Sequence, residues 1–251
     1  MEKWTSSVLL ALTAVACGNG QPKQASSALV HDISGVWAGP ALPTLQEPAP
    51  FTPLGKQRYE ANKATWGPNA VGLAESNDPL ITCDPLGFPR SMLYETRGFE
   101  FVHTPTKTIE LLQYQRAWRE IWTDGRPLPK DVGGASADSL DPRWYGYSVG
   151  KWVDDSTFAV ETVGTDERSW VDYFGRPHSG AAHFEERYRR VDANTLEVTV
   201  TITDPEIYTK PYVAMKQTFQ RAARQELEEQ LCVPSEAIDY FKTIAEPAGV
   251  K

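Results

Sequence analysis

The chain has 251 residues, of which 41% are hydrophobic and 23% are charged, and its formal net charge is −8. This balance is typical of a globular protein with enough apolar side chains for one sizeable core. A short basic cluster, RYRR at 187–190, directly follows Glu185 and Glu186. Nucleic acid is not an expected partner, because neutralising phosphates requires many clustered Lys and Arg residues.

The first sixteen residues differ from the rest of the chain. A short polar start that contains Lys3 is followed by the largely apolar run VLLALTAVA. Nine residues cannot cross a hydrocarbon layer, which needs about twenty. We therefore interpret residues 1–16 as a secretion signal and exclude them from the analysis of the fold.

Cys17 follows Ala14-Val15-Ala16 and resembles the cysteine of the bacterial lipobox. That resemblance implies a lipidated Cys17 as the first mature residue, although the motif prefers leucine where Ala14 stands. Ordinary secretion with cleavage near Ala16 is the alternative. Residues 17–30 then form a flexible tether and residues 31–251 one domain. The expected location is the cell envelope, as a periplasmic or outer-membrane lipoprotein that contacts the membrane through its lipid only.

Export also changes the interpretation of the other two cysteines. Cys83 and Cys232 are an even pair in an oxidising compartment, so a disulfide between them is expected. Two unpaired thiols are the alternative. No spacing of Cys, His, Asp and Glu predicts a metal site.

Prolines dominate the segment after the first expected strand. Residues 32–37 are typical of a short strand, and the five prolines between 40 and 53 exclude a regular helix or an inner strand. Thr52 before Pro53 is a typical helix start, so a short helix is expected over 54–64.

From residue 92 onwards, strand-forming stretches alternate with turn sequences. The expected strands are 92–95, 99–103, 108–115, 116–125, 147–153, 157–164, 182–191, 195–202 and 212–220. Short joins predict antiparallel neighbours, that is, a meander. Such a sheet leaves exposed edges unless it closes, so we expect a barrel, with a sandwich as the alternative.

The end of the chain returns to a helical pattern. A helix is expected over 236–245, begun by Pro234 and stopped by Pro247. Its apolar residues Ile238 and Phe241 recur at helical spacing. We expect this short amphipathic helix to dock on the barrel.

Gly35-Val36-Trp37 at the first strand, followed by a meander, resembles the Gly-x-Trp signature of lipocalins and related calycins. The resemblance implies a mainly β, lipocalin-like barrel in which the tryptophan packs under a basic side chain from a late strand. Arg187, Arg189 and Arg190 are the candidates for that side chain.

A second resemblance covers residues from about 31 to 250. The chain is similar to a family of exported bacterial proteins of uncharacterised function. The motifs that carry this similarity are FTPLGKQRYEANK, CDPLGFPR, REIWTDGR, DPRWYGYSVGKW, FGRPHS, EERYRRVD and DPEIYTKPY. The resemblance supports the domain boundaries and implies no activity.

The tract 169–180, SWVDYFGRPHSG, places reactive and aromatic side chains on a connection between two expected strands. His178 and Asp172 together are candidates for acid–base catalysis. Trp170 and Phe174 are candidate ligand-binding residues. The alternatives are that the polar residues satisfy backbone groups of the loop and that the tract plugs the end of the barrel.

Two further stretches carry aromatic residues. Trp144, Tyr145, Tyr147 and Trp152 form a cluster that contains two glycines, and Trp122 ends an expected strand. These five side chains either line a cavity for a ring-shaped ligand or pack the barrel. Glu120 is a third catalytic candidate if its face of the strand points into the barrel, whereas on the outer face it pairs with a surface Arg and matters little.

The sequence therefore predicts a barrel protein that binds a small, mostly apolar or aromatic molecule. The alternative is a cofactor-independent lyase, isomerase, cyclase or hydrolase that uses His178 with Asp172 or Glu120. A structural envelope lipoprotein with a filled barrel is a third reading. No phosphate-binding glycine loop, nucleophile elbow or dinucleotide fingerprint is present, so no cofactor is expected.

Overall fold

The computed structural model describes residues 30–39, 48–93 and 98–249. The expected signal peptide, Cys17 and nearly all of the tether lie outside these residues. Among the residues that are described, no helix has the length and apolar character that a membrane span requires.

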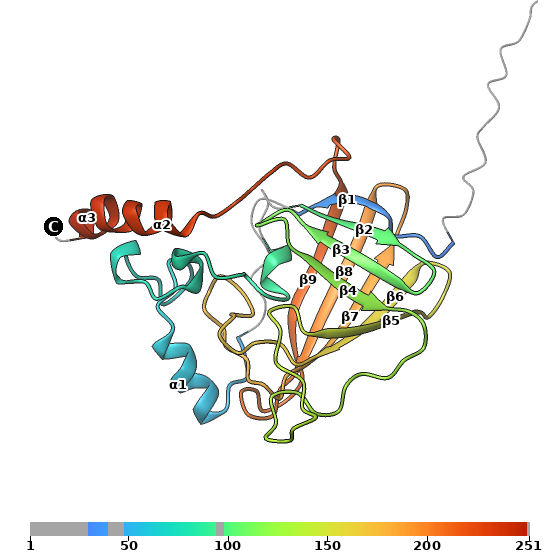
Figure 1. The fold of residues 1–251 in the computed structure, drawn as a ribbon, viewed down its shortest axis with the longest axis horizontal. Helices are drawn as coiled ribbons and strands as arrows, with labels where there is room; N and C mark the ends of the chain where they lie inside the picture. The colour runs from blue at the N-terminus through green and yellow to red at the C-terminus, as the bar shows by residue number, and fades with distance from the viewer. Residues whose placement is uncertain (1–29, 40–47, 94–97, 250–251) are drawn as a thin grey trace, which may run out of the picture.

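Nine strands form a closed barrel in which sequence neighbours pair and β1 closes against β9 (Figure 1). They are β1 (Gly35–Ala38), β2 (Phe99–His103), β3 (Lys107–Leu112), β4 (Trp118–Trp122), β5 (Tyr147–Trp152), β6 (Thr157–Val163), β7 (His183–Arg190), β8 (Thr195–Thr203) and β9 (Tyr212–Arg221). The predicted barrel is confirmed, and the sandwich alternative is wrong.

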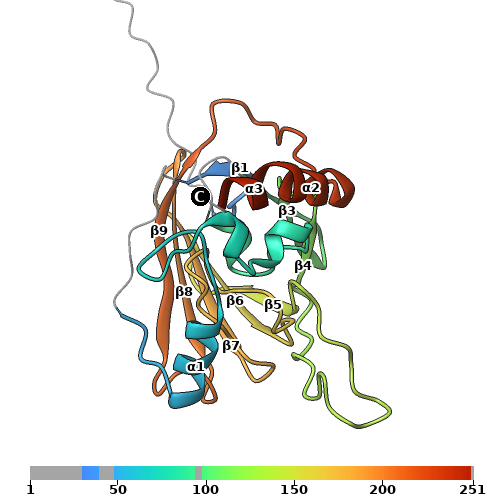
Figure 2. The same cartoon turned by 90° about the vertical axis from the view of Figure 1, so that its left-hand side faces the viewer.

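One pair of strands departs from the expected antiparallel meander. β4 and β5 run parallel and share two register pairs, Ile121 with Ser148 and Trp122 with Val149. Parallel neighbours require a crossover connection, and residues 123–146 provide it as a long loop beside the barrel (Figure 2). The short-connection argument fails here because this connection is long.

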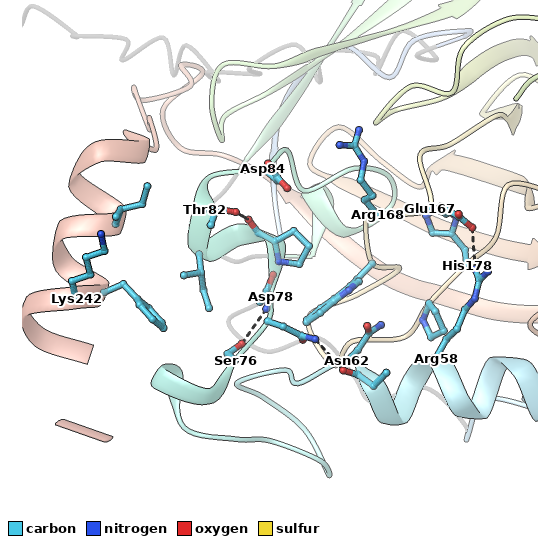
Figure 3. Close-up of a pocket in the computed structure, with 18 residues that line it drawn as sticks. Arg58, Asn62, Ser76, Asp78, Thr82, Asp84, Glu167, Arg168, His178 and Lys242 are labelled. Atoms are coloured by element: carbon cyan, nitrogen blue, oxygen red, sulfur yellow. Dashed lines mark hydrogen bonds and ion pairs between the residues drawn. The ribbon is translucent and has the colours of Figure 1, made fainter. Parts of the chain in front are cut away.

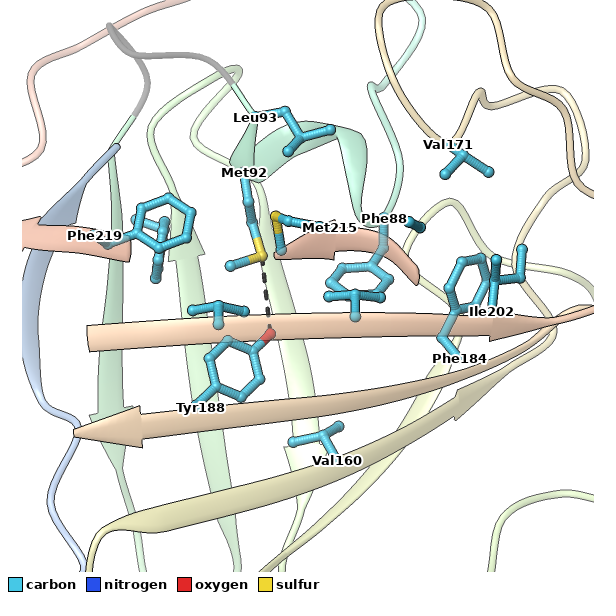
Figure 4. Packing of buried hydrophobic residues seen from close by; sticks show 14 of the residues in the cluster. Phe88, Met92, Leu93, Val160, Val171, Phe184, Tyr188, Ile202, Met215 and Phe219 are labelled. Atoms are coloured by element: carbon cyan, nitrogen blue, oxygen red, sulfur yellow. Dashed lines mark hydrogen bonds between the residues drawn. The ribbon is translucent and has the colours of Figure 1, made fainter. Parts of the chain in front are cut away.

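Buried side chains fill the barrel interior (Figure 4). Part of the filling comes from residues 86–93, where Phe88 packs edge-on against Phe184 at 5.6 Å between ring centroids. The Tyr188 hydroxyl lies 3.8 Å from Met92 Sδ. Met92 belongs to the 3-10 helix η3 (Arg90–Met92), whose three residues are all buried. The strand expected at 92–95 is therefore wrong for Met92 and Leu93, and its other two residues are not described.

Trp37 makes the contact that the Gly-x-Trp resemblance implies. The Arg190 guanidinium carbon lies 4.8 Å from the centroid of the fully buried Trp37 ring. The indole N–H donates to the Ile33 carbonyl at 3.0 Å. Arg190, at the end of β7, is thus the partner among the three candidate arginines. Nine strands and one parallel pair nevertheless differ from the eight-stranded antiparallel barrel of lipocalins.

Short helices lie along one side of the barrel (Figures 1 and 2). They are α1 (Pro53–Ala61), the 3-10 helices η1 (Leu73–Glu75) and η2 (Pro79–Thr82), and the C-terminal α2 (Pro234–Tyr240), η4 (Phe241–Ala245) and α3 (Glu246–Gly249). Thr52 Oγ1 caps α1 by accepting from Gly55 N at 3.0 Å, in the segment where the sequence places a helix.

The C-terminal helix packs on η1 and η2 instead of the barrel, which corrects the expected docking. Pro247 does not stop it, because proline is tolerated in the first turn of the following α3. The predicted Cys83–Cys232 disulfide is confirmed, with 5.5 Å between the Cα atoms. It joins the end of η2 to the segment before α2 and so fastens this helix to the rest of the molecule.

Candidate functional site

The tract 169–180 both plugs the barrel and lines a cleft. Val171 and Tyr173 join the hydrophobic core. Trp170 and His178 line a cleft of about 770 Å³, here called the helix cleft, between α1, η2, this tract and the C-terminal helix (Figure 3). Some side chains of this tract therefore pack into the core of the barrel, and others line a site.

His178 does not contact Asp172. Its Nε2 lies 3.0 Å from Ser169 Oγ, and its Nδ1 lies 3.1 Å from the Ser179 carbonyl. Burial lowers the pKa of the fully buried His178 ring, so the ring is neutral near pH 7. Asp172 instead pairs with Arg176 and accepts from Phe174 N at 2.9 Å. The structure therefore does not bring the predicted pair together, because each partner bonds with groups of its own loop.

These contacts predict a structural role for His178. The substitution His178→Ala is expected to lower the free energy of unfolding by about 2 kcal/mol, since it opens a cavity and removes the ring's contacts with Ser169 Oγ and the Ser179 carbonyl. The control is His183→Ala on β7, where the partly exposed ring pairs with Glu161 at 3.3 Å and should matter little. Urea denaturation measures both. Equal stability of the two variants would contradict the structural role.

Glu120 lies on the outer face of β4 and forms an ion pair with Lys107. Trp118 and Trp122 share this outer face, whereas Arg119 and Ile121 are buried inside. The outward alternative is confirmed, and a catalytic Glu120 inside the barrel is wrong.

A group of buried polar side chains occupies the inner face of β3–β7. This buried polar cluster consists of Glu110, Arg119, Ser148, Thr162, Glu186 and Tyr188. Arg119 Nη1 donates to Glu186 Oε2 at 3.0 Å and to Glu110 Oε2 at 3.2 Å. Its Nε donates to Ser148 Oγ at 3.0 Å. On the side of the barrel interior, the Phe88 ring covers the guanidinium of Arg119, with 4.0 Å between Arg119 Cζ and the ring centroid.

The two carboxylates of this cluster are not equivalent. Glu186 also accepts from Thr162 Oγ1 and from the Tyr188 hydroxyl, each at 2.7 Å. Glu110 accepts from Arg119 alone, and its Oε1 has no hydrogen-bond partner among the described residues. Burial is the main cause that raises the pKa of Glu110 to about 7. The positive charge of Arg119 lowers this pKa, and the negative charge of Glu186 raises it further. Glu110 therefore exchanges a proton near neutral pH.

Glu110 and Arg119 are functional candidates that the pattern of the expected strands does not indicate. The apolar residues Ile109 and Leu111 are only half-buried, while Glu110 between them is fully buried. The pairing register of β3 and β4 could have identified them. Glu110 lies directly opposite Arg119 in this register, so two opposite charges share the inner face.

A second pocket of about 800 Å³ lies between β4, β5 and the crossover loop; we call it the seam pocket. Its floor includes Arg119 and Ser148 of the buried polar cluster. Its aromatic lining comes from Trp118, Trp122, Trp144, Tyr145 and Tyr147. Four of these five, all except Trp118, are ligand-binding candidates from the sequence. They come from two separate stretches of the chain, β4 and residues 144–147, which meet at this pocket.

Cations pack on the faces of these rings. The contacts are Arg126 Cζ over Trp122 at 3.4 Å, Lys107 Nζ over Trp122 at 4.8 Å, Arg143 Cζ over Tyr147 at 4.2 Å and Arg168 Cζ over Trp144 at 4.5 Å. Such contacts hold the rings in fixed orientations, which lowers the entropic cost of stacking a ligand on them.

The other aromatic candidates lie elsewhere. Trp152, at the end of β5, stacks on His31 with 5.0 Å between the ring centroids. Trp170 lines the helix cleft, where the Arg90 guanidinium carbon is 5.1 Å from its ring centroid. Phe174 packs against Tyr173 at 4.5 Å and lies beside Arg176. The structure thus separates the tract 169–180 from the seam pocket.

No family model, curated protein or solved structure matches this chain. In the described part of the chain, no group of three His, Cys, Asp or Glu side chains lies close enough to hold a metal ion.

Proposed function

We propose that the protein binds a small molecule with a flat, mostly apolar body in the seam pocket. The observation that carries this proposal is the convergence of five aromatic side chains on a pocket of about 800 Å³. Pockets of this size hold one small organic molecule.

The exposure of the rim supports binding. Trp118 is 64% exposed and Leu140 is 42% exposed, and both line the seam pocket. An indole that gains little from the protein's own packing is available to a ligand, and clustered exposed apolar side chains mark binding sites.

We further propose that the protein is exported to the cell envelope and belongs to the lipocalin-like barrels and to the exported bacterial family that its motifs resemble. The support is the apolar run before Cys17, the Arg190–Trp37 contact and a disulfide that suits an oxidising compartment. The enzyme alternative loses its His178–Asp172 geometry, and Glu110 becomes its acid–base candidate beside the seam pocket.

Trp118→Ala tests the binding proposal. We expect the Kd for the fluorescent probe N-phenylnaphthylamine to rise by about tenfold, because truncating an aromatic contact removes more than about 1 kcal/mol of binding energy. Stability should change by less than about 0.5 kcal/mol, since the side chain is exposed.

The matched control is Trp66→Ala, in which the residue is 60% exposed and does not line the seam pocket. Probe binding should be unchanged in that variant. If wild-type protein binds no probe, or if both variants weaken binding equally, the seam pocket is not the site.

A further inference from the structure

The seam pocket has a lining whose charge is opposite to that of the whole chain. The chain carries −8, yet the charged side chains that line the pocket are Arg119, Arg126, Arg143 and Glu120. The lining thus contains three cations and one anion, and a cation among them that has no carboxylate partner in the described part of the chain favours a negatively charged ligand.

Most of these charges already have partners. Arg119 is paired with Glu110 and Glu186, Arg126 with Asp124, and Glu120 with Lys107. Arg143 differs: among the described residues no carboxylate lies within ion-pair distance of it, and its guanidinium packs on the Tyr147 ring. Arg143 is therefore free to form a bidentate pair with a carboxylate or sulfonate of a ligand.

The buried polar cluster sets the charge beneath the pocket floor. Every N–H of Arg119 has an acceptor: Ser148 and Thr162 take three of its hydrogen bonds, and the two carboxylates take the others. Ser148 and Thr162 also contact each other at 2.9 Å. Within the part of the chain that the structure describes, Glu110 Oε1 is the atom of the cluster that has no hydrogen-bond partner, and its side chain is 0% exposed.

The state of Glu110 therefore decides the charge of the cluster. With Glu110 protonated, Arg119 and Glu186 cancel; with Glu110 ionised, the cluster carries one negative charge. The groups that act on Glu110 or respond to it are Arg119 on β4, Glu186 and Tyr188 on β7, and Tyr145 before β5. Tyr145 also lines the seam pocket.

We propose that the seam pocket binds a flat organic anion, such as an aromatic carboxylate, whose acid group pairs with Arg143, and that Glu110 takes up a proton as the anion binds. This inference rests on the proposed function. A ligand's negative charge over the Arg119–Ser148 floor disfavours a second negative charge on Glu110. Since the pKa of Glu110 is raised to about 7, the coupling falls in the neutral range.

Three probes with the same ring test the ligand class: naphthoate, naphthylmethanol and naphthylmethylammonium, titrated by calorimetry into the full mature protein. At about pH 6 we expect naphthoate to bind about tenfold more tightly than the alcohol, through one charge-assisted pair. The ammonium should bind most weakly. The affinity for naphthoate should fall about fivefold by about pH 8, when Glu110 is ionised, while that for the alcohol stays constant.

One variant tests which residue causes the preference for the anion, and a second tests which residue causes the dependence on pH. Arg143→Gln should abolish the preference for naphthoate over the alcohol; its control is Arg187→Gln, an exposed arginine on β7 outside the pocket. Glu110→Gln imitates the protonated carboxyl, so naphthoate binding should become independent of pH. Its control is Glu185→Gln, an exposed neighbour of Glu186. The Arg143→Gln change also removes the guanidinium from the Tyr147 ring, so the quantity compared in each variant is the ratio of the naphthoate affinity to the alcohol affinity.

The outcomes separate this inference from the proposed function. If none of the three probes binds wild-type protein, the proposed function fails. If the alcohol binds as tightly as naphthoate, or the ammonium binds most tightly, the pocket is real and the anion inference is wrong. If naphthoate is preferred but Glu110→Gln keeps the wild-type pH dependence, the proton does not go to Glu110 and the inference is overturned.

Discussion

Replacing Arg119 by methionine is expected to lower the free energy of unfolding by about 3–5 kcal/mol near pH 7. The reason is that Glu110 and Glu186 then remain buried without a counter-charge, and both side chains are fully buried. Urea denaturation at about pH 7 measures the loss.

The control is Arg187→Met on the outer face of β7, for which the change should stay within about 0.5 kcal/mol. A loss below about 1 kcal/mol for Arg119→Met would show that the cluster is not an ion-paired unit. A triple variant, Arg119→Met with Glu110→Leu and Glu186→Leu, removes every charge of the cluster. It should recover most of the lost stability, because apolar groups of similar volume replace buried ion pairs at little cost.

The strands were predictable wherever one face is apolar. In β8, Leu196, Val198, Val200 and Ile202 are fully buried, as the alternation predicts. The inner face around Glu110 was not predictable in this way, because its polar residues are satisfied by partners on other strands. A single strand's pattern contains no information about those partners.

The aromatic stretches were found from the sequence, but their common location was not. Trp122 and Tyr147 approach each other because β4 and β5 pair in parallel, and the crossover loop that permits this carries no simple signature. His178 was misassigned for the opposite reason: a reactive residue type in a rigid loop is also well suited to bond with that loop.

The buried carboxyl of Glu110 predicts an unusual dependence of stability on pH. Its pKa is raised from 4.5 to about 7 in the folded protein. Between these values the folded state binds more protons than the unfolded chain, so this group's contribution to stability falls as pH rises. The contribution is fully present below about pH 4.5 and is lost as pH rises through about 7, and its size is about 3 kcal/mol.

Glu110→Gln removes this dependence while keeping an oxygen that accepts from Arg119. Relative to wild type, the variant should therefore gain about 2–3 kcal/mol of stability between about pH 5 and about pH 8. Urea denaturation of both proteins across that range, with Glu185→Gln as the exposed control, measures the difference. If the difference between Glu110→Gln and wild type stays constant with pH, Glu110 does not change its protonation in this range. The proton coupling of the seam pocket would then have no physical basis, whereas the aromatic pocket itself would still stand, because its walls do not depend on this carboxyl.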